Sequence, residues 1–88
     1  MTYSVEYSKG AFKDLKKMDT QTRKLILSWI EKNLVNCSDP RVHGKSLRGN
    51  RQDEWRYRVG DYRILANIHD DKILIFVLKI GHCREVYD

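Results

Sequence analysis

Cysteine is scarce in this 88-residue chain, which contains only Cys37 and Cys83. Two cysteines are too few for a disulfide framework and their spacing matches no metal-binding motif, so we expect two reduced thiols. The sequence also has no apolar run near the ~20 residues of a membrane-spanning helix. We expect no signal peptide either. These absences predict a cytoplasmic protein that has no membrane partner.

Familiar catalytic motifs are missing too. The sequence has no H-E-x-x-H, no C-x-x-C and no glycine-rich phosphate loop between a strand and a helix. What it does contain is positive charge, with 17 Lys and Arg against 12 Asp and Glu and a net charge of +5. This excess favours polyanionic partners such as nucleic acid.

The stretch 54–87 contains three strand-like runs, separated only by Gly60-Asp61 and Asp70-Asp71. Gly and Asp tolerate the positive φ of tight hairpin turns. Apolar and polar residues alternate in the first two runs, whereas residues 73–80 are apolar on both sides apart from Lys79, as in a central strand. We predict an antiparallel meander with one apolar core face. The arginines that project from its other face are Arg56, Arg58 and Arg63.

The first half of the chain predicts one strand and two helices. Residues 2–7 alternate as a half-buried strand does, and Ser8 is a suitable N-cap for the helix that follows. Asp19 or Thr20 caps a second helix that extends to about Val35. Because so few residues separate the helices, we expect an antiparallel helical hairpin. The lysines on the polar side of the first helix are Lys9, Lys13, Lys16 and Lys17.

Residues 36–50 contain Pro40, Gly44 and Gly49 and are expected to form a connector, with a short extended piece around Ser46-Leu47. The order is therefore strand, helix, helix and three strands. It predicts a single α+β domain over residues 1–88, with the helical hairpin packed on one face of a small antiparallel sheet. The first strand is expected beside or near one edge of the meander.

Four short motifs follow one another along the chain: K-S-L-R-G at 45–49, W-R-Y-R at 55–58, G-D-Y-R at 60–63 and G-H-C-R-E-V-Y at 81–87. Together they resemble the RelE/ParE toxin superfamily, over essentially the whole chain. The resemblance implies a RelE-like fold and a toxin of a type II toxin–antitoxin pair that a cognate antitoxin neutralises. In the RelE branch such toxins cut mRNA in the ribosomal A site. In the ParE branch they inhibit DNA gyrase.

RNA cleavage needs the 2′-hydroxyl to be deprotonated, the phosphate charge to be stabilised and the 5′-oxygen to be protonated, and it needs no metal or other cofactor. Arginine suits the second task because it binds phosphate with two parallel hydrogen bonds and stays charged. The resemblance implies Arg56 and Arg58 as phosphate-binding and base-orienting groups, Arg63 as the transition-state clamp and Tyr87 as the general base. Further candidate phosphate-binding residues are Lys45 and Arg48.

The last motif departs from the family pattern at one position. Its third residue is commonly Arg, which helps to protonate the leaving group, but this chain has Cys83 there. Either Arg84 takes over that role, or His82 supplies the proton, or the activity is weaker. Histidine is chemically the better acid near neutral pH.

The predicted partners are mRNA, the ribosome and an antitoxin whose acidic residues complement the positive charge. Operator DNA is expected to be bound only through the antitoxin complex. The lysines of the first helix are predicted to dock on ribosomal RNA. Two alternatives are a gyrase inhibitor and a degenerate toxin that serves as a co-repressor with its antitoxin. The polar set of Arg56, Arg58, Arg63 and Tyr87 favours the nuclease.

Overall fold

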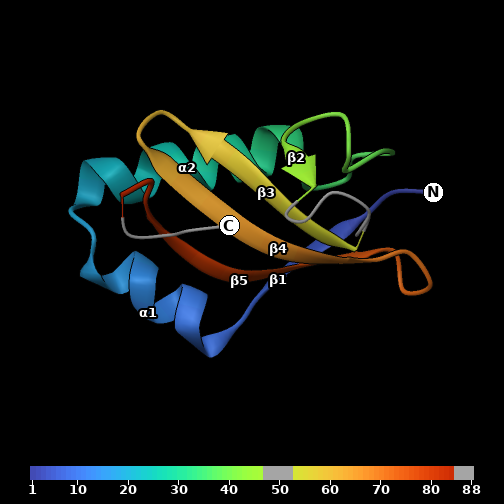
Figure 1. The fold of residues 1–88 in the computed structure, drawn as a ribbon, viewed down its shortest axis with the longest axis horizontal. Helices are drawn as coiled ribbons and strands as arrows, with labels where there is room; N and C mark the ends of the chain where they lie inside the picture. The colour runs from blue at the N-terminus through green and yellow to red at the C-terminus, as the bar shows by residue number, and fades with distance from the viewer. Residues whose placement is uncertain (47–52, 85–88) are drawn as a thin grey trace.

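The computed structural model of the chain describes residues 1–46 and 53–84 (Figure 1). Its elements follow the expected order, and the short extended piece predicted in the connector is a two-residue strand. They are β1 (Ser4–Tyr7), α1 (Lys9–Lys17), α2 (Thr20–Asn33), β2 (Lys45–Ser46), β3 (Glu54–Val59), β4 (Tyr62–His69) and β5 (Leu74–His82). The predicted α+β class and the C-terminal meander are confirmed.

The five strands form one sheet in the order β1-β5-β4-β3-β2. Strand β5, which was predicted to be central, lies between β4 and β1. The expected all-antiparallel sheet is wrong in one respect, because β1 pairs with β5 in parallel. A parallel pair cannot be joined by a tight hairpin, and here the whole segment that contains both helices, β2, β3 and β4 makes the connection.

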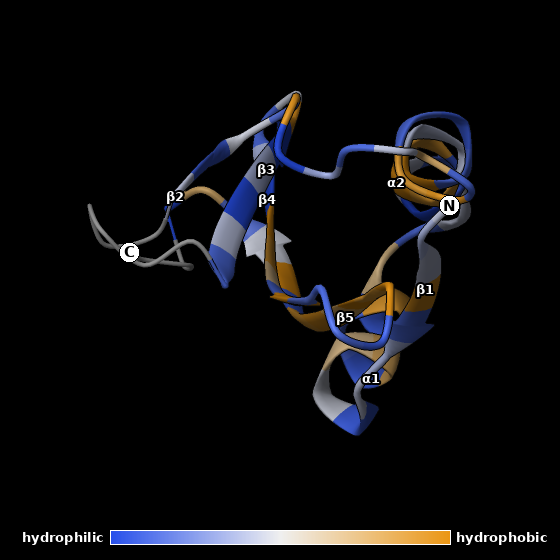
Figure 2. Cartoon of the chain, turned by 90° about the vertical axis from the view of Figure 1, so that its right-hand side faces the viewer, coloured by the Kyte–Doolittle hydropathy of each residue, from blue (hydrophilic) through white to orange (hydrophobic). Residues whose placement is uncertain are grey.

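One face of the sheet carries the core. Ile64 on β4 lies opposite Tyr57 on β3 and Ile80 on β5, and all three side chains are almost fully buried. Both helices contribute to the same cluster, through Ala11 and Leu15 of α1 and through Ile26, Ile30 and Leu34 of α2. The strands also differ from one another in hydropathy, since β5 is mostly hydrophobic and β3 is mostly hydrophilic (Figure 2). The opposite face of the sheet is therefore available for polar side chains.

The helices begin at the predicted caps. The Ser8 hydroxyl accepts a hydrogen bond from the Ala11 amide at 3.0 Å, and the Asp19 carboxylate accepts one from the Thr22 amide at 3.2 Å. From the turn at Met18 the two helices diverge, so the hairpin is open (Figure 1). Neither helix is long and apolar enough to cross a membrane, within the part of the chain that the structure describes.

Helix α1 is held on β5 at a β-bulge, where the β4–β5 register shifts between Leu65 and Ala66. The bulge leaves backbone groups of β5 without ladder partners. The Ser8 hydroxyl donates to the carbonyl of Leu78, the residue that the register shift leaves without a partner, at 2.8 Å. Asp14 accepts from the amide of Ile80, which lies beyond the pairing of β5 with β1, at 3.0 Å. These two hydrogen bonds attach α1 to β5.

A small polar network ties the connector to the β4–β5 turn. Arg41 donates two hydrogen bonds to the Asp70 carboxylate, at 3.1 and 3.0 Å, and the Tyr3 hydroxyl donates a third at 2.6 Å. These hydrogen bonds, that of Arg41 first, hold the pKa of Asp70 below its ordinary value. The charged form of Asp70 is thus the one that stabilises the fold.

Replacing Asp70 with asparagine is expected to lower the free energy of unfolding at pH 7 by less than about 1 kcal/mol, because exposed ion pairs contribute little. The contribution of Asp70 is present above its unfolded-state pKa of ~4. It is lost as the pH falls through the lowered folded-state value. Urea unfolding of both proteins at pH 7 and at about pH 2 measures this. A difference that persists unchanged at the lower pH would contradict the assignment.

Candidate functional site

Four of the predicted RNA-binding and catalytic cations line one cavity of about 430 Å³. They come from β2, β3 and β4, and we refer to the space between them as the cation cavity. Its cations are Lys45, Arg56, Arg58 and Arg63, and its other lining residues are Trp29, His43, Gly44 and Tyr57. Their roles in catalysis stay predictions, but the structure brings all four cations together.

The strand register explains why these cations meet. Lys45 lies opposite Arg56, and Arg58 lies opposite Arg63. Residues that lie opposite each other in a ladder project from the same face of the sheet. Arg58 is exposed, and its Nε donates to the Gly60 carbonyl at 2.9 Å, which holds the guanidinium near the β3–β4 turn. Positive charge is therefore concentrated over β2, β3 and β4, where it can bind phosphate.

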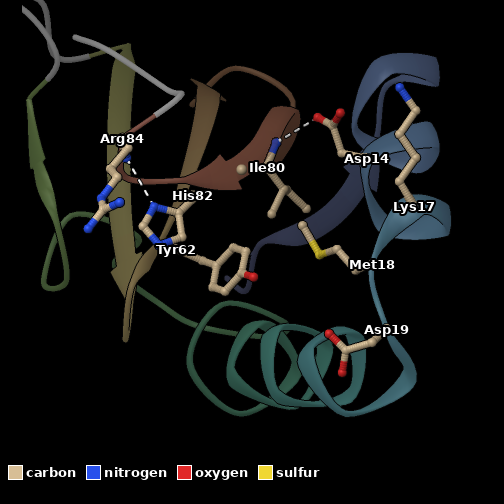
Figure 3. A pocket seen from close by; sticks show the side chains of 9 residues that line it. Asp14, Lys17, Met18, Asp19, Tyr62, Ile80, His82 and Arg84 are labelled. Atoms are coloured by element: carbon tan, nitrogen blue, oxygen red, sulfur yellow. Dashed lines mark hydrogen bonds between the residues drawn. The ribbon is translucent and has the colours of Figure 1, made fainter.

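His82 and Arg84 lie elsewhere. His82 is opposite Tyr62 in the β4–β5 ladder, and their rings pack edge to face with centroids 5.5 Å apart. Both residues line a second cavity of about 470 Å³ beside α1, together with Arg84, Lys17 and other residues (Figure 3). The Nδ1 atom of His82 accepts a hydrogen bond from the Arg84 amide at 3.2 Å.

This placement separates the predicted proton donors from the predicted phosphate-binding residues. Arg63 lies opposite Gly81, one residue before His82, so the side chains of Arg63 and His82 project from opposite faces of the sheet. Among the described residues, neither His82 nor Arg84 lines the cation cavity. Cys83, where the last motif departs from the pattern that the resemblance implies, donates its backbone amide to the Asp61 carbonyl at 2.9 Å. The predicted Arg48 and Tyr87 lie outside the described residues.

The lysines of α1 do not form a purely charged surface. A groove of about 320 Å³ runs between α1 and α2, with Tyr7, Leu15 and Leu27 in its lining. Phe12 also lines it and is 53% exposed, while the Lys16 Nζ lies 4.7 Å from the centre of the Phe12 ring. Lys9 and Lys13 border the adjoining hollow. Lys17, the fourth lysine of the predicted stripe, lines the second cavity instead.

Sequence reasoning missed four residues of the cation cavity, namely Trp29, His43, Gly44 and Tyr57. Gly44 has a φ of +80° and approaches β3 so closely that a Cβ would lie 2.9 Å from Cδ1 of Tyr57. The adjacent His43 carbonyl accepts a hydrogen bond from Nε1 of Trp55 at 2.6 Å. The only sequence signal was that His43 and Gly44 directly precede the first motif.

The described residues contain no group of three or more His, Cys, Asp or Glu side chains that could hold a metal ion. The chemistry that the cation cavity offers is electrostatic. Guanidinium and ammonium groups from three strands can bind one phosphate and stabilise additional negative charge on it.

Comparison with known proteins gives a family match over nearly the entire chain. Residues 5–87 match the family described as ParE toxin of the type II toxin–antitoxin system parDE. Toxin RelG of Mycobacterium tuberculosis is 26% identical over 87 residues, which are 99% of this chain and 98% of that protein. The mRNA interferase toxin RelE of Escherichia coli is 26% identical over 83 residues, covering 92% of this chain and 83% of RelE.

Solved structures share the fold. The toxin–antitoxin complex RelBE2 of Mycobacterium tuberculosis contains a chain that matches with a TM-score of 0.80 and 26% identity, covering 93% of this chain and 92% of that one. The archaeal RelE–RelB complex of Pyrococcus horikoshii matches with a TM-score of 0.68 and 21% identity, covering 93% and 96%. At that lower identity the likeness shows the fold alone.

Proposed function

This chain belongs to the ParE toxin family of type II toxin–antitoxin systems, and from that premise we propose that it is a ribosome-dependent mRNA interferase of the RelE type. One observation carries the proposal: Lys45, Arg56, Arg58 and Arg63 line the same cavity. A scissile phosphate is the ligand that such a cluster suits best. The similarity to the mRNA interferase toxin RelE supports the same proposed function.

In the proposed reaction the 2′-oxygen of one nucleotide attacks the adjacent phosphorus, and the bond from phosphorus to the 5′-oxygen breaks. The products are a 2′,3′-cyclic phosphate and a 5′-hydroxyl. Tyr87 accepts the proton of the 2′-hydroxyl, and Arg63 stabilises the charge that develops on the phosphate. The ribosome contributes by holding the message in line for attack.

The proton for the 5′-oxygen need not come from a side chain of the cation cavity. Cations beside the leaving oxygen stabilise its negative charge and so reduce the need for a dedicated acid. In this scheme water protonates the 5′-oxygen. That fits a chain in which His82 and Arg84 line the second cavity and Cys83 replaces the usual arginine.

Replacing Tyr87 with phenylalanine is expected to slow cleavage about 100-fold, because the variant cannot accept the proton of the 2′-hydroxyl. Single-turnover cleavage of mRNA on programmed ribosomes measures this rate. The effect should shrink as the pH rises, since hydroxide then replaces the phenolate as base. A loss of less than threefold at neutral pH would remove Tyr87 from the role.

Inhibition of DNA gyrase is the second candidate, and the ParE description of the matching family favours it. The two functions are separated by adding the purified chain to a cell-free translation reaction and to a gyrase supercoiling reaction. We expect inhibited translation with shortened mRNA and unchanged supercoiling. Blocked supercoiling with intact mRNA would establish the rival function.

We also propose that a cognate antitoxin binds the groove between α1 and α2. The structural neighbour that is 26% identical to this chain belongs to a toxin–antitoxin complex, which supports an antitoxin as partner. The groove offers the half-exposed ring of Phe12 and the ammonium group of Lys16, and Lys9 and Lys13 line the adjoining hollow, so the surface suits an amphipathic segment with acidic residues. An antitoxin bound there covers lysines that are proposed to dock on ribosomal RNA, which would neutralise the toxin.

Replacing Phe12 with glutamate is expected to weaken binding of the antitoxin about 30-fold, because aromatic anchors in apolar grooves dominate such interfaces. Leu25→Glu is the matched control, since Leu25 is 55% exposed on α2 but does not line the groove. Titration calorimetry with the purified antitoxin measures both variants. Equal affinities of the two variants would place the antitoxin elsewhere.

A further inference from the structure

The cation cavity has an aromatic wall that phosphate binding does not explain. The rings of Trp29 and His43 pack edge to face with centroids 5.8 Å apart, and the ring of Tyr57 lies 5.7 Å from that of Trp29. All three residues line the same cavity as the cations. Positive charge and aromatic rings are therefore available to one ligand.

Two hydrogen bonds position residues of this aromatic wall. Tyr57 is only 1% exposed, and its hydroxyl donates to the Pro40 carbonyl at 2.7 Å. Burial raises the pKa of Tyr57 well above its ordinary value, so the phenol stays a neutral donor. The Trp55 indole fixes the backbone of His43 through the 2.6 Å hydrogen bond to its carbonyl.

The exposed part of this wall is His43. His43 is exposed, whereas Trp29 is half-buried and Tyr57 is buried in the core. An exposed imidazole adds little to core packing, yet the backbone of His43 is positioned by a hydrogen bond and by the positive φ of the adjacent Gly44. A ring that is held in place and left accessible at the mouth of a cavity is suited to contact a ligand.

We propose that His43 and Trp29 form a nucleobase-binding subsite of the cation cavity, which takes one base of a single-stranded RNA while the cations hold its phosphate. The inference rests on the proposed function, which supplies RNA as the substrate. Base stacking on aromatic side chains and cationic contacts to the backbone are the two components of single-strand recognition. A volume of about 430 Å³ is within the range of sites that enclose a small ligand.

Two consequences follow for recognition. RNA with a base at the bound nucleotide should be held more tightly than the same backbone without that base. Purines should be preferred over pyrimidines, because they offer a larger surface for stacking. His43 would thereby influence which nucleotide of the message is held beside Arg58 and Arg63.

The test uses fluorescence anisotropy with two labelled RNA trinucleotides. Both carry 2′-O-methyl groups throughout, so neither can be cleaved, and the second lacks only its central base. The wild-type chain is expected to bind the complete trinucleotide about tenfold more tightly than the abasic one. His43→Ala should abolish this ratio and leave binding of the abasic RNA unchanged, while His43→Phe should restore it.

His69→Ala is the matched control, because His69 lies at the far end of β4, near the β4–β5 turn, and does not line the cavity. It should retain the wild-type ratio. Thermal melting identifies any variant that fails to fold, and His43→Phe then decides the outcome. Equal binding of the two trinucleotides by the wild-type chain would overturn the inference. So would a His43→Ala variant that loses affinity for both RNAs to the same extent.

The outcome is independent of catalysis, because the measurement contains no ribosome and no cleavable bond. A base-dependent ratio that disappears in His43→Ala would support the subsite even if the chain leaves mRNA intact on ribosomes, and only the interferase proposal would then fail. Codon-phased mRNA cleavage by a chain that binds both trinucleotides equally would support the interferase proposal and overturn the nucleobase subsite.

Discussion

Replacing Arg63 with alanine is expected to lower the rate of mRNA cleavage on translating ribosomes about 1,000-fold. Arg63 lies on β4 opposite Arg58, and both line the cation cavity. During cleavage, negative charge builds up on the phosphate oxygens, and a guanidinium that is already in position stabilises it without reorganisation. The loss should appear in the single-turnover rate, while ribosome binding changes little.

The control for this prediction is Lys72→Ala. It also removes one positive charge, but Lys72 is exposed in the β4–β5 turn, far along β4 from Arg63. We expect Lys72→Ala to cleave at the wild-type rate within about threefold, since one distant surface charge is largely screened. Arg63→Ala activity as high as that of the control would show that the cation cavity is not where the phosphate is cleaved.

Replacing Gly44 with alanine is expected to lower the free energy of unfolding by about 3 kcal/mol and to abolish activity. The added Cβ would collide with the backbone carbonyl of Arg56 and lie 2.9 Å from Cδ1 of Tyr57, at a φ of +80°. Neither neighbour can move easily, because Arg56 is part of β3 and Tyr57 is in the core. The connector must therefore lift away from β3, which opens the cation cavity.

Gly60→Ala separates steric collision from backbone strain. Gly60 also has a positive φ, of +60°, but a Cβ there would have no heavy atom within 4 Å. We expect Gly60→Ala to cost only about 1 kcal/mol, as strain alone does. Chemical denaturation of both variants measures the difference. Equal stabilities would show that the close approach of Gly44 to β3 does not hold the cavity together.

Much of the fold was predictable because local physics determines it. Ser8 and Asp19 cap the helices through their own side chains, and Gly60 supplies the positive φ of a turn. The parallel pairing of β1 with β5 was not predictable, because it depends on which edge of the meander remains available. The attachment of α1 to β5 was also hidden, since it depends on hydrogen bonds of Leu78 and Ile80 with Ser8 and Asp14, which are distant in sequence.

The candidate site was also predictable only in part. Alternation along β3 and β4 was enough to predict that Arg56, Arg58 and Arg63 share a face. The separation of His82 from Arg63 required the β4–β5 register, which the sequence does not specify. His43 is brought to the cavity by a connector whose path depends on the conformation of Gly44 and on contacts with the sheet. Such tertiary contacts leave no periodic signal in the sequence.

The separation of the α1–α2 groove from the cation cavity has a consequence for neutralisation. The groove between α1 and α2, where the antitoxin is proposed to bind, is lined by none of the cation-cavity residues. An antitoxin in that groove would therefore block docking of the toxin on the ribosome rather than occupy the phosphate site. The Phe12→Glu variant should accordingly escape neutralisation by the antitoxin.

Mapping mRNA 5′ ends after addition of the purified chain to translating ribosomes tests the central claim most directly. The account predicts new 5′ ends that carry a hydroxyl, recur at a fixed position within codons and disappear in Arg63→Ala. The same message without ribosomes should remain intact, because alignment by the ribosome is part of the mechanism. Message that stays intact on ribosomes, or cuts that persist unchanged in Arg63→Ala, would contradict it.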